Sequence, residues 1–231
     1  MSSPEPAGPG PGVSLPAPEY TEYAKTYPAA PRTSLPVPAE TGMPLAEALR
    51  KRRSVRKYGD RPLTAAELGA LCFAANGTTG ELPGRATKTI PSAGALYPME
   101  LYVVVNAVDG VEPGLYHYDG GAHQLELMGI GDFREKAFRA CYGQKWTMKA
   151  AVVFAMSAIF ERSKRKYGER VSRYIPAESG HMSQNLYLMS TALNLGGVAI
   201  GAYKDAEWNA LLGLDGTSES VIYLQVAGPL P

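Results

Sequence analysis

Short runs of hydrophobic residues along this chain predict the strands of a β-sheet. Continuous apolar runs at residues 100–106 and 150–156 are typical of strands that are buried on both faces, and residues 220–228 predict a last strand. Two shorter runs, at 114–118 and 124–128, are separated by Gly120-Gly121, which indicates a hairpin. A glycine-rich segment at 194–202 contains one more short strand.

The positions between these runs predict helices. Thr64 and Glu67 form a capping box at the start of a helix that ends at Asn76-Gly77, and the polar residues 77–90 predict a loop. A long helix is predicted within residues 180–196, where apolar residues recur at helical spacing: Met182, Leu186, Met189 and Leu193. Shorter helices are predicted after Asp132, at 160–167 and after Asp205. This order of elements indicates an α+β body with a mixed sheet and helices on its faces.

Proline content divides the chain into two parts. Ten of the 19 prolines precede Ala39, and this part has no apolar periodicity. Such a segment cannot bury enough surface to offset the entropy of ordering it. We therefore expect residues 1–41 to form a proline-rich tail, flexible or wrapping a partner subunit, and residues 42–231 to form one folded domain. Tyr20, Tyr23 and Tyr27 could anchor the tail or remain solvated.

Composition and charge argue against several classes of function. The chain has 231 residues, of which 45% are hydrophobic and 19% charged, and its net charge of +1 favours neither a nucleic acid nor a membrane surface as a partner. No apolar run is long enough to span a bilayer, and the N-terminus lacks the pattern of a secretory signal. Two cysteines and three histidines show neither a disulfide framework nor metal-ligand spacing. A reduced, cytoplasmic setting without a metal site is therefore expected.

Two segments carry the residue types of a ligand site. Residues 50–57 contain six cations in eight positions together with Ser54, and guanidinium groups bind phosphate through paired hydrogen bonds. A solvated basic face or a localisation signal would show the same pattern. The segment Pro91-Ser-Ala-Gly-Ala-Leu-Tyr-Pro98 leads into the strand at 100–106. Its prolines fix the backbone and its small residues allow a flat or anionic ligand to approach closely, although a rigid turn without a ligand is the alternative.

Two polar pairs on predicted helices are the remaining candidates. Gln184 and Asn185, near the start of the long helix, would need polar partners if they are buried, and they could also be exposed. Lys166 and Tyr167 end the helix at 160–167. Lys166 is either a specific functional group or one more cation on a basic helix.

These segments, in this order, resemble the nitroreductase-like flavoenzymes, and in particular their SagB-type dehydrogenase branch. The resemblance covers residues 45–228. It rests on Arg-Arg-Ser-x-Arg at 52–56, the Pro91–Pro98 segment, Gly114-Leu-Tyr-His-Tyr118, Lys166-Tyr-Gly-x-Arg170, Gly180-His-x-x-Gln-Asn185 and Leu211-Leu-Gly-Leu-Asp215. It implies an α+β nitroreductase fold, a homodimer, and one FMN in each interface cleft.

The resemblance also implies roles for individual residues. The FMN phosphate would be bound by the basic segment, through Arg52, Ser54 and Arg56, with Arg53 beside them. The flavin ring would be faced by small residues of the proline-bracketed loop, namely Pro91, Ser92, Ala93 and Gly94. Gly201, in the turn with Ile200, would offer a backbone N–H near the reactive edge of the ring, and Gln184 and Asn185 would lie near the cofactor.

A reaction follows from the same resemblance. The pair Lys166-Tyr167 is similar to a Lys-Tyr pair of azoline dehydrogenases, which aromatise a thiazoline or oxazoline ring in a peptide-derived product. Lys166, activated by partial burial, would take a proton from the ring while the flavin accepts a hydride, and Tyr167 would position or relay. The alternatives are an NAD(P)H-dependent nitro, quinone or enone reductase on the same flavin, and a non-catalytic partner in a biosynthetic complex.

Overall fold

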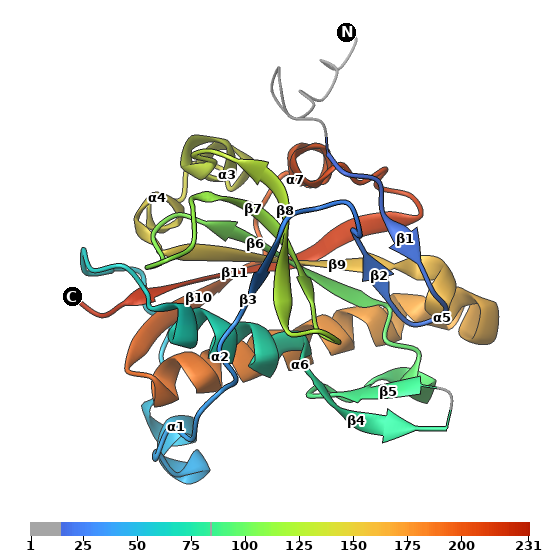
Figure 1. The fold of residues 1–231 in the computed structure, drawn as a ribbon, viewed down its shortest axis with the longest axis horizontal. Coiled ribbons are helices and arrows are strands. Elements are labelled where there is room, and N and C mark those ends of the chain that lie inside the picture. Colours follow the sequence, from blue (N-terminus) through green and yellow to red (C-terminus); the bar gives the residue numbers. More distant parts are fainter. Residues whose placement is uncertain (1–14, 84) are drawn as a thin grey trace, which may run out of the picture.

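A single seven-stranded sheet forms the centre of the computed structural model, which describes residues 15–83 and 85–231 (Figure 1). Neighbouring strands run antiparallel throughout. From edge to edge the strands are β10 (Leu195–Ile200), β11 (Glu219–Pro229), β9 (Val152–Ile159), β6 (Met99–Val105), β7 (Gly114–Asp119), β8 (Gln124–Ile130) and β3 (Arg32–Ser34).

The α+β fold class is confirmed, but the strand directions differ from the predicted mixed sheet. Within the described residues, parallel pairing is confined to isolated bridges, which join Ser54 to Gly197 and Leu63 to Val108. The predicted hairpin is present as β7 and β8, which pair from Gly114 and Ile130 to Asp119 and Gln124. The predicted strands at 100–106, 150–156 and 220–228 correspond to β6, β9 and β11.

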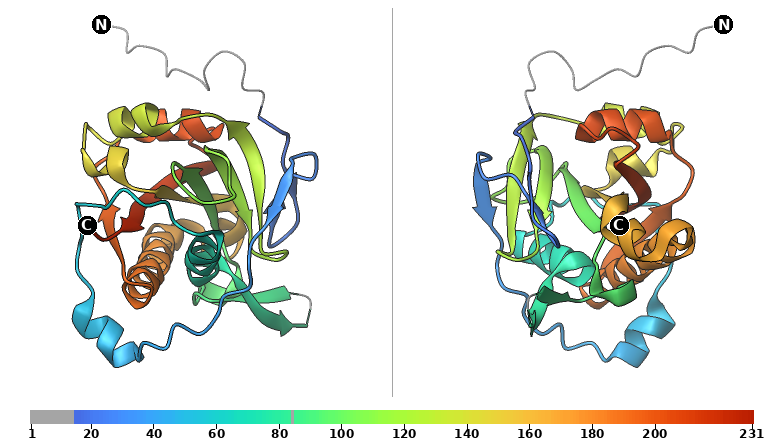
Figure 2. Two further views of the ribbon diagram at one scale, coloured as in Figure 1. Left: turned by 60° about the vertical axis from the view of Figure 1, so that its left-hand side comes forward. Right: turned by 90° about the vertical axis from the view of Figure 1, so that its right-hand side faces the viewer.

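Helices cover both faces of the sheet (Figures 1 and 2). Helices α2 and α6 pack on one face, α3, α4 and α7 lie on the other, and α5 follows the end of β9. Their bounds are α1 Leu45–Lys51, α2 Ala65–Asn76, α3 Arg134–Ala140, α4 Trp146–Lys149, α5 Phe160–Tyr167, α6 Val171–Ala192 and α7 Asp205–Leu212. In the part of the chain that the structure describes, no helix is both long enough and apolar enough to cross a membrane.

Strand β6 shows why its sequence is apolar at nearly every position. Leu101 and Val103 pack into the core beneath α2 and α6, whereas Tyr102 and Val104 pack into the core beneath α3 and α7. Successive side chains of a strand point to opposite faces, so a strand between two helical layers buries both sets. The long apolar run therefore indicates that this strand lies in the centre of the sheet.

Helix α6 is longer than the sequence pattern predicts. It begins at Val171, not near residue 180, and it contains Pro176 and Gly180. Pro176 lies in the second turn, where a proline removes one helical hydrogen bond, yet Ile175 is buried against the sheet and favours continuing the helix. As a result Gln184 and Asn185, predicted near the helix start, lie past its middle.

Two local predictions have different outcomes. The capping box of α2 is confirmed, because Glu67 N donates to Thr64 Oγ1 at 3.1 Å and Thr64 N donates to Glu67 Oε2 at 2.8 Å. The loop predicted at 77–90 is wrong in part, because it contains a hairpin of β4 (Thr78–Leu82) and β5 (Arg85–Lys88). Glycine and proline are rare inside strands, so the sequence of this segment predicts a loop and not a hairpin.

The N-terminal segment packs on the body where its composition predicts a tail. It contributes the edge strand β3, and it forms a short hairpin of β1 (Glu19–Tyr20) and β2 (Lys25–Thr26). Tyr27 is only 2% exposed and Lys25 only 3% exposed. Residues 1–14 of the predicted tail lie outside the described residues. The packing of residues 15–41 follows from specific polar contacts that proline content does not reveal.

Buried polar groups hold this segment against the sheet. Lys25 Nζ lies 2.6 Å from Glu219 Oε2 and donates to Tyr102 Oη at 2.6 Å. Tyr27 Oη and Tyr102 Oη lie 3.0 Å apart, and Ser157 Oγ donates to Glu219 Oε1 at 2.6 Å. Each buried charge in this set therefore has an opposite charge or a hydrogen-bonding partner, as burial requires.

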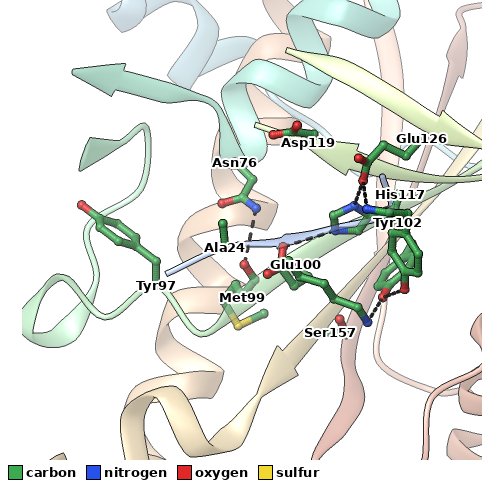
Figure 3. Close-up of polar contacts among 12 residues, drawn as sticks. Ala24, Asn76, Tyr97, Met99, Glu100, Tyr102, His117, Asp119, Glu126 and Ser157 are labelled. Carbon is green, nitrogen blue, oxygen red and sulfur yellow. Dashed lines mark hydrogen bonds and ion pairs between the residues drawn. The ribbon is translucent and has the colours of Figure 1, made fainter. Parts of the chain in front are cut away.

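A second set of buried charges adjoins the first (Figure 3). His117 Nδ1 lies 2.9 Å from Glu126 Oε2, which accepts from Tyr27 N, and His117 Nε2 lies 3.3 Å from Glu100 Oε2. Burial alone would lower the pKa of His117, but its hydrogen bonds to Glu100 and Glu126 raise it. Burial alone would raise the pKa of Glu100, but Arg162, 2.7 Å away, and His117 lower it to about 2.

Candidate functional site

The proline-bracketed loop is fixed by a carboxylate on α6. Glu178 Oε1 accepts from Ser92 Oγ at 2.9 Å and from Ala93 N at 3.0 Å, and Ser92 Oγ in turn accepts from Tyr97 N at 2.9 Å. Ala93–Ala95 form one 3₁₀ turn in which Gly94 has a positive φ of 63°. The loop is therefore held in one conformation by its own hydrogen bonds and by Glu178.

Glu178 is a site residue that the sequence pattern did not single out. Its side chain is almost fully buried, and its second oxygen, Oε2, has no hydrogen-bond partner among the described residues. Burial raises the pKa of this carboxyl, against the opposing hydrogen bonds from Ala93 and Ser92. In the sequence Glu178 is only an isolated acidic residue within a helical segment, and its contact with the loop becomes visible only in the structure.

Lys166 and Tyr167 lie directly against the loop. A Cβ on Gly94 would lie 2.6 Å from Tyr167 Oη and 2.9 Å from Lys166 Nζ, and the positive φ of Gly94 favours glycine at this position. Lys166 Nζ lies 5.4 Å from the centroid of the Tyr167 ring, and that ring packs edge-on against Tyr174. The structure thus brings three predicted site residues together, although they come from distant parts of the sequence.

Lys166 departs from one expectation. Its side chain is exposed, whereas its predicted role as a base rests on partial burial. Tyr167 is half-buried. Pro91 is exposed, and its carbonyl oxygen lies 3.3 Å from His181 Nδ1 on α6. The face of the loop beside Lys166 is therefore open in the single chain.

The basic segment contacts the other half of α6. The Arg52 guanidinium lies 5.1 Å from the centroid of the Tyr187 ring, and Ser54 Oγ lies 3.1 Å from Tyr187 Oη. The same phenolic oxygen accepts from Ala199 N at 2.9 Å, and Ser54 forms a bridge to Gly197. Tyr187 therefore joins the basic segment to the end of β10.

The cations of this segment have no acidic partner except at its start. Lys51 pairs with Glu47 within α1, but in the described part of the chain no carboxylate lies within ion-pair distance of Arg52, Arg53 or Arg56. Arg53 Nη1 donates to the carbonyl oxygens of Arg50 and Arg52, and Arg56 stacks 5.5 Å from the Trp146 ring. Guanidinium groups that are half-buried (Arg52) or exposed (Arg53 and Arg56) and have no carboxylate partner in the described residues suit an anionic ligand.

Gln184 and Asn185 have different environments. Gln184 is exposed. Asn185 Nδ2 donates to Ala74 O at 2.9 Å and to Thr89 O at 3.3 Å, which ties α6 to α2 and to the end of the β4–β5 hairpin. Asn185 also lines an apolar cavity of about 490 Å³ beside α1. Asn185 therefore has hydrogen bonds within the fold, and a role of either residue toward a cofactor stays a prediction.

Ile200 and Gly201 mark the end of β10. Ile200 is buried in the core beneath α7, so its contribution to a ligand site would be through the backbone. Gly201 is exposed, and a Cβ there would meet only Tyr223, at 3.7 Å. The backbone at Gly201 is thus open to a ligand, in agreement with the expected N–H contact, which remains untested.

The candidate residues fall into two groups along one helix. Glu178 contacts the loop that carries Ser92 and Gly94, and Tyr187 contacts the basic segment. Nine residues of an α-helix span about 13 Å, so the two groups suit the two ends of an elongated ligand. Among the described residues there is no group of three or more His, Cys, Asp or Glu side chains that could hold a metal ion.

Comparison with known sequences identifies relatives over most of the chain. A model of the nitroreductase family matches residues 49–228. The nitroreductase homologue MJ1384 of Methanocaldococcus jannaschii is 44% identical over 168 residues, which cover 73% of this chain and 83% of that protein. The trifolitoxin-processing protein TfxB of Rhizobium leguminosarum bv. trifolii is 33% identical over 113 residues, which cover 47% of this chain but only 30% of TfxB.

Solved structures share the fold. A nitroreductase homologue from Ralstonia eutropha has a TM-score of 0.74 and 27% identity, covering 96% of this chain and 97% of its own. One from Anabaena variabilis has a TM-score of 0.77 and 31% identity over 88% of this chain, which spans only 42% of that protein. A chain of the Escherichia coli microcin synthetase McbBCD complex shares the fold at a TM-score of 0.65 and 22% identity, covering 80% of this chain and 73% of its own. The chain therefore belongs to the nitroreductase family of flavoprotein oxidoreductases.

Proposed function

We propose that this chain binds FMN along α6 and uses it to oxidise an organic substrate. Members of the nitroreductase family bind FMN. The donor set fits that group: Arg52 and Arg56 are cations without an acidic partner in the described residues, and Ser54 adds a hydroxyl for the phosphate. Ser92, Ala93 and Gly94 present backbone and little side-chain bulk to a flat ring.

The chain's own residues would orient and deprotonate the substrate. Bound FMN would supply a two-electron acceptor for a hydride. Lys166 would accept the proton that leaves the substrate, and Tyr167 would position the substrate against Gly94. Glu178 would keep the loop in place through Ser92 and Ala93. The observation that carries the proposal is the convergence of Lys166, Tyr167 and Gly94 at one point.

The substrate we favour is a thiazoline or oxazoline ring in a peptide-derived natural product. Conversion to the azole removes one proton and one hydride, which matches a base beside a flavin. The similarity to TfxB, a toxin-processing protein, supports a role in processing a peptide. The shared fold with a chain of a microcin synthetase complex points the same way and suggests that partner enzymes present the substrate.

We further propose that the active form is a homodimer. Leu45 and Leu49 are exposed on α1, beside the apolar cavity that Asn185 lines. Burying such a surface against a second copy would remove it from water and narrow the open side of the site. Light scattering of the purified protein should give twice the chain mass of 24.7 kDa. A monomer at micromolar concentration would contradict this part.

The experiment that tests the function compares two lysines of the same helix. The purified protein should absorb as a flavoprotein and convert a peptide with a single thiazoline to the thiazole, seen as the loss of two hydrogen atoms by mass spectrometry. Lys166→Met should lower the turnover about 100-fold or more with FMN content unchanged. The matched control Lys164→Met, an exposed cation two residues before Lys166 on the same helix, should retain activity. Equal activity of both variants would overturn the role of Lys166.

A reductase is the second candidate, because the relative MJ1384 bears the name of a nitroreductase. In that case NAD(P)H would rapidly bleach the flavin absorption without oxygen, and the Lys166→Met variant would keep this reaction. A flavin that NAD(P)H does not bleach would favour an organic electron donor. A colourless protein that takes up no added FMN would contradict both candidates.

A further inference from the structure

A cavity of about 270 Å³ lies beside the β4–β5 hairpin, and its lining shares no residue with the candidate site described above. Its walls come from the turn between β1 and β2, from the β4–β5 hairpin, and from the ends of β6 and β7. Figure 3 labels Ala24, Glu100 and Asp119 of its lining, which come from three different elements. The N-terminal segment thus closes one side of a space that the sheet alone would leave open.

Most charges around this cavity are already compensated. Lys25 pairs with Glu219, and Glu100 pairs with Arg162 and His117. Asp119 Oδ1 accepts from Gly121 N at 2.9 Å and from Ala122 N at 3.1 Å, and its Oδ2 accepts from Gln124 Nε2 at 3.4 Å. These groups therefore have partners without any ligand.

Two cations of the lining are different. Arg85 Nη1 donates to Gly94 O at 3.0 Å, and Lys88 Nζ donates to Asn76 Oδ1 at 3.1 Å. Both acceptors are neutral, and among the described residues no carboxylate lies within ion-pair distance of Arg85 or Lys88. Lys88 is half-buried and lies 5.8 Å from the Tyr97 ring. Burial lowers the pKa of Lys88, and the carboxylate of Glu100 opposes this shift without coming within ion-pair distance, so an anion bound beside the ammonium group would stabilise it.

We infer that this cavity binds the carboxylate of a small organic molecule, between Arg85 and Lys88. Lys25 and Glu100 are paired with charges outside the lining, which leaves Arg85 and Lys88 against the single carboxylate of Asp119, so a monoanion balances the lining and a phosphate dianion does not. The volume lies below the usual range for drug-sized ligands, which suits an amino-acid-sized group. A charge-assisted hydrogen bond from each cation would hold the carboxylate.

Arg85 links this subsite to the reactive loop. Because its guanidinium contacts the Gly94 carbonyl while it lines the cavity, a carboxylate bound to Arg85 would be joined through this side chain to the loop that Lys166 and Tyr167 contact. A substrate anchored here through an acidic group could extend toward the loop. The inference itself concerns binding only and does not depend on FMN, so it stands or falls separately from the proposed oxidation.

The test follows the backbone amides of Gly120 and Gly121, which line the cavity, by ¹H–¹⁵N NMR of the full-length protein. N-acetylglycine is the probe, and N-acetylglycinamide is its neutral counterpart of the same shape. We expect N-acetylglycine to shift both glycine signals in a saturable way and the amide to leave them unchanged. Equal shifts with both compounds, or no shift with either, would overturn the carboxylate site.

Variants assign the effect to the two cations. Lys88→Met keeps the length of the side chain and removes its charge, and we expect it to weaken N-acetylglycine binding at least fivefold. Arg85→Gln should have an effect of similar size. Lys149→Met, an exposed lysine on α4 away from the cavity, should change nothing. An unchanged affinity in both cavity variants would refute the assignment.

Two further measurements complete the test. Circular dichroism and thermal unfolding of each variant should match the parent, and the Gly120 and Gly121 signals should keep their positions without ligand. Inorganic phosphate is the competing probe. If it shifts these two signals at lower concentration than N-acetylglycine, the preference for a monoanionic carboxylate is wrong.

Discussion

Two sets of charged residues in this protein are arranged in opposite ways. Beneath the N-terminal segment, Lys25 and Glu219 are buried and paired at 2.6 Å. In the basic segment, Arg52 and Arg56 are accessible, and their guanidinium groups lie over the rings of Tyr187 and Trp146. The first set is satisfied within the chain, whereas no carboxylate among residues 15–83 and 85–231 pairs with Arg52 or Arg56.

The difference separates a structural role from a binding role. A buried charge needs its partner because water cannot replace it, so loss of one member is costly. An exposed cation is solvated already and adds little to stability, so its conformation and charge are available for a ligand. Mutations in the first set should therefore change the stability of the fold, and mutations in the second set should change ligand affinity.

The largest effect on stability is expected for Lys25→Met. The substitution leaves Glu219 buried without its cation, and breaking a buried pair from one side costs about 3–5 kcal/mol. Urea unfolding followed by circular dichroism would measure the change. A double variant, Lys25→Met with Glu219→Gln, should recover part of the loss, because no uncompensated charge remains. A loss below 1 kcal/mol in the single variant would show that Lys25 is not held as described.

The free energy of unfolding should fall both at acidic pH, because of Glu100, and at alkaline pH, because of His117. The pKa of Glu100 is lowered to about 2, so its contribution is present above its ordinary value of 4.5 and is lost as the pH falls toward 2. This shift corresponds to about 3 kcal/mol. The pKa of His117 is raised, so its contribution is complete below its ordinary value of 6.5 and is lost as the pH rises through the folded-state value.

Stability should therefore be highest between about pH 4.5 and 6.5. Urea midpoints across a pH series would show the two limits. His117→Gln should flatten the decline on the alkaline side. A stability that is constant from pH 5 to 9 in the parent protein would contradict the raised pKa of His117.

A smaller effect, on binding and not on stability, is expected for Arg52→Gln. If Arg52 binds the phosphate as proposed, removing this charge-assisted hydrogen bond should raise the dissociation constant of FMN about tenfold or more. The free energy of unfolding without FMN should change by less than about 0.5 kcal/mol, since the side chain is not fully buried. Quenching of FMN fluorescence measures the first quantity, with Lys149→Gln as the control. A stability loss without an affinity loss would place Arg52 in the structural set.

The smallest effect is expected for Glu22→Gln. The substitution breaks the ion pair between Glu22 and Arg165. The side chain of Arg165 is 42% exposed and that of Glu22 is 54% exposed. Such surface pairs contribute less than about 1 kcal/mol. Thermal unfolding should hardly move, which makes this variant the counterpart of Lys25→Met in the same segment. A loss as large as that of Lys25→Met would remove the contrast between buried and exposed pairs.

The central strands could be predicted because both faces of the sheet are buried, so nearly every residue of these strands is apolar. Val103 and Val104 face different helical layers, and both must be apolar. The strand β3 could not be predicted, because Arg32–Ser34 is a short polar edge strand among prolines. The start of α6 was also missed, since Pro176 and Gly180 indicate an end of a helix when tertiary packing is not considered.

The candidate site could be predicted only where the residue type carries the chemistry. The arginines at 52–56 and the small residues of the loop stand out in the sequence because few other structural demands produce them. Glu178, Arg85 and Lys88 do not stand out, since an isolated charge is usually solvated and only their position relative to Gly94 and the cavity distinguishes them. Contacts between distant segments are what the sequence pattern lacks.

The edge strand β3 also constrains the order of events during synthesis of the chain. It leaves the ribosome before all other strands of the sheet, yet its partner β8 ends only at Ile130. The partner of Lys25 is made later still, because Glu219 lies 194 residues further along the chain. The segment that carries Lys25 and β3 therefore completes its contacts with the sheet only after Glu219 has been synthesised.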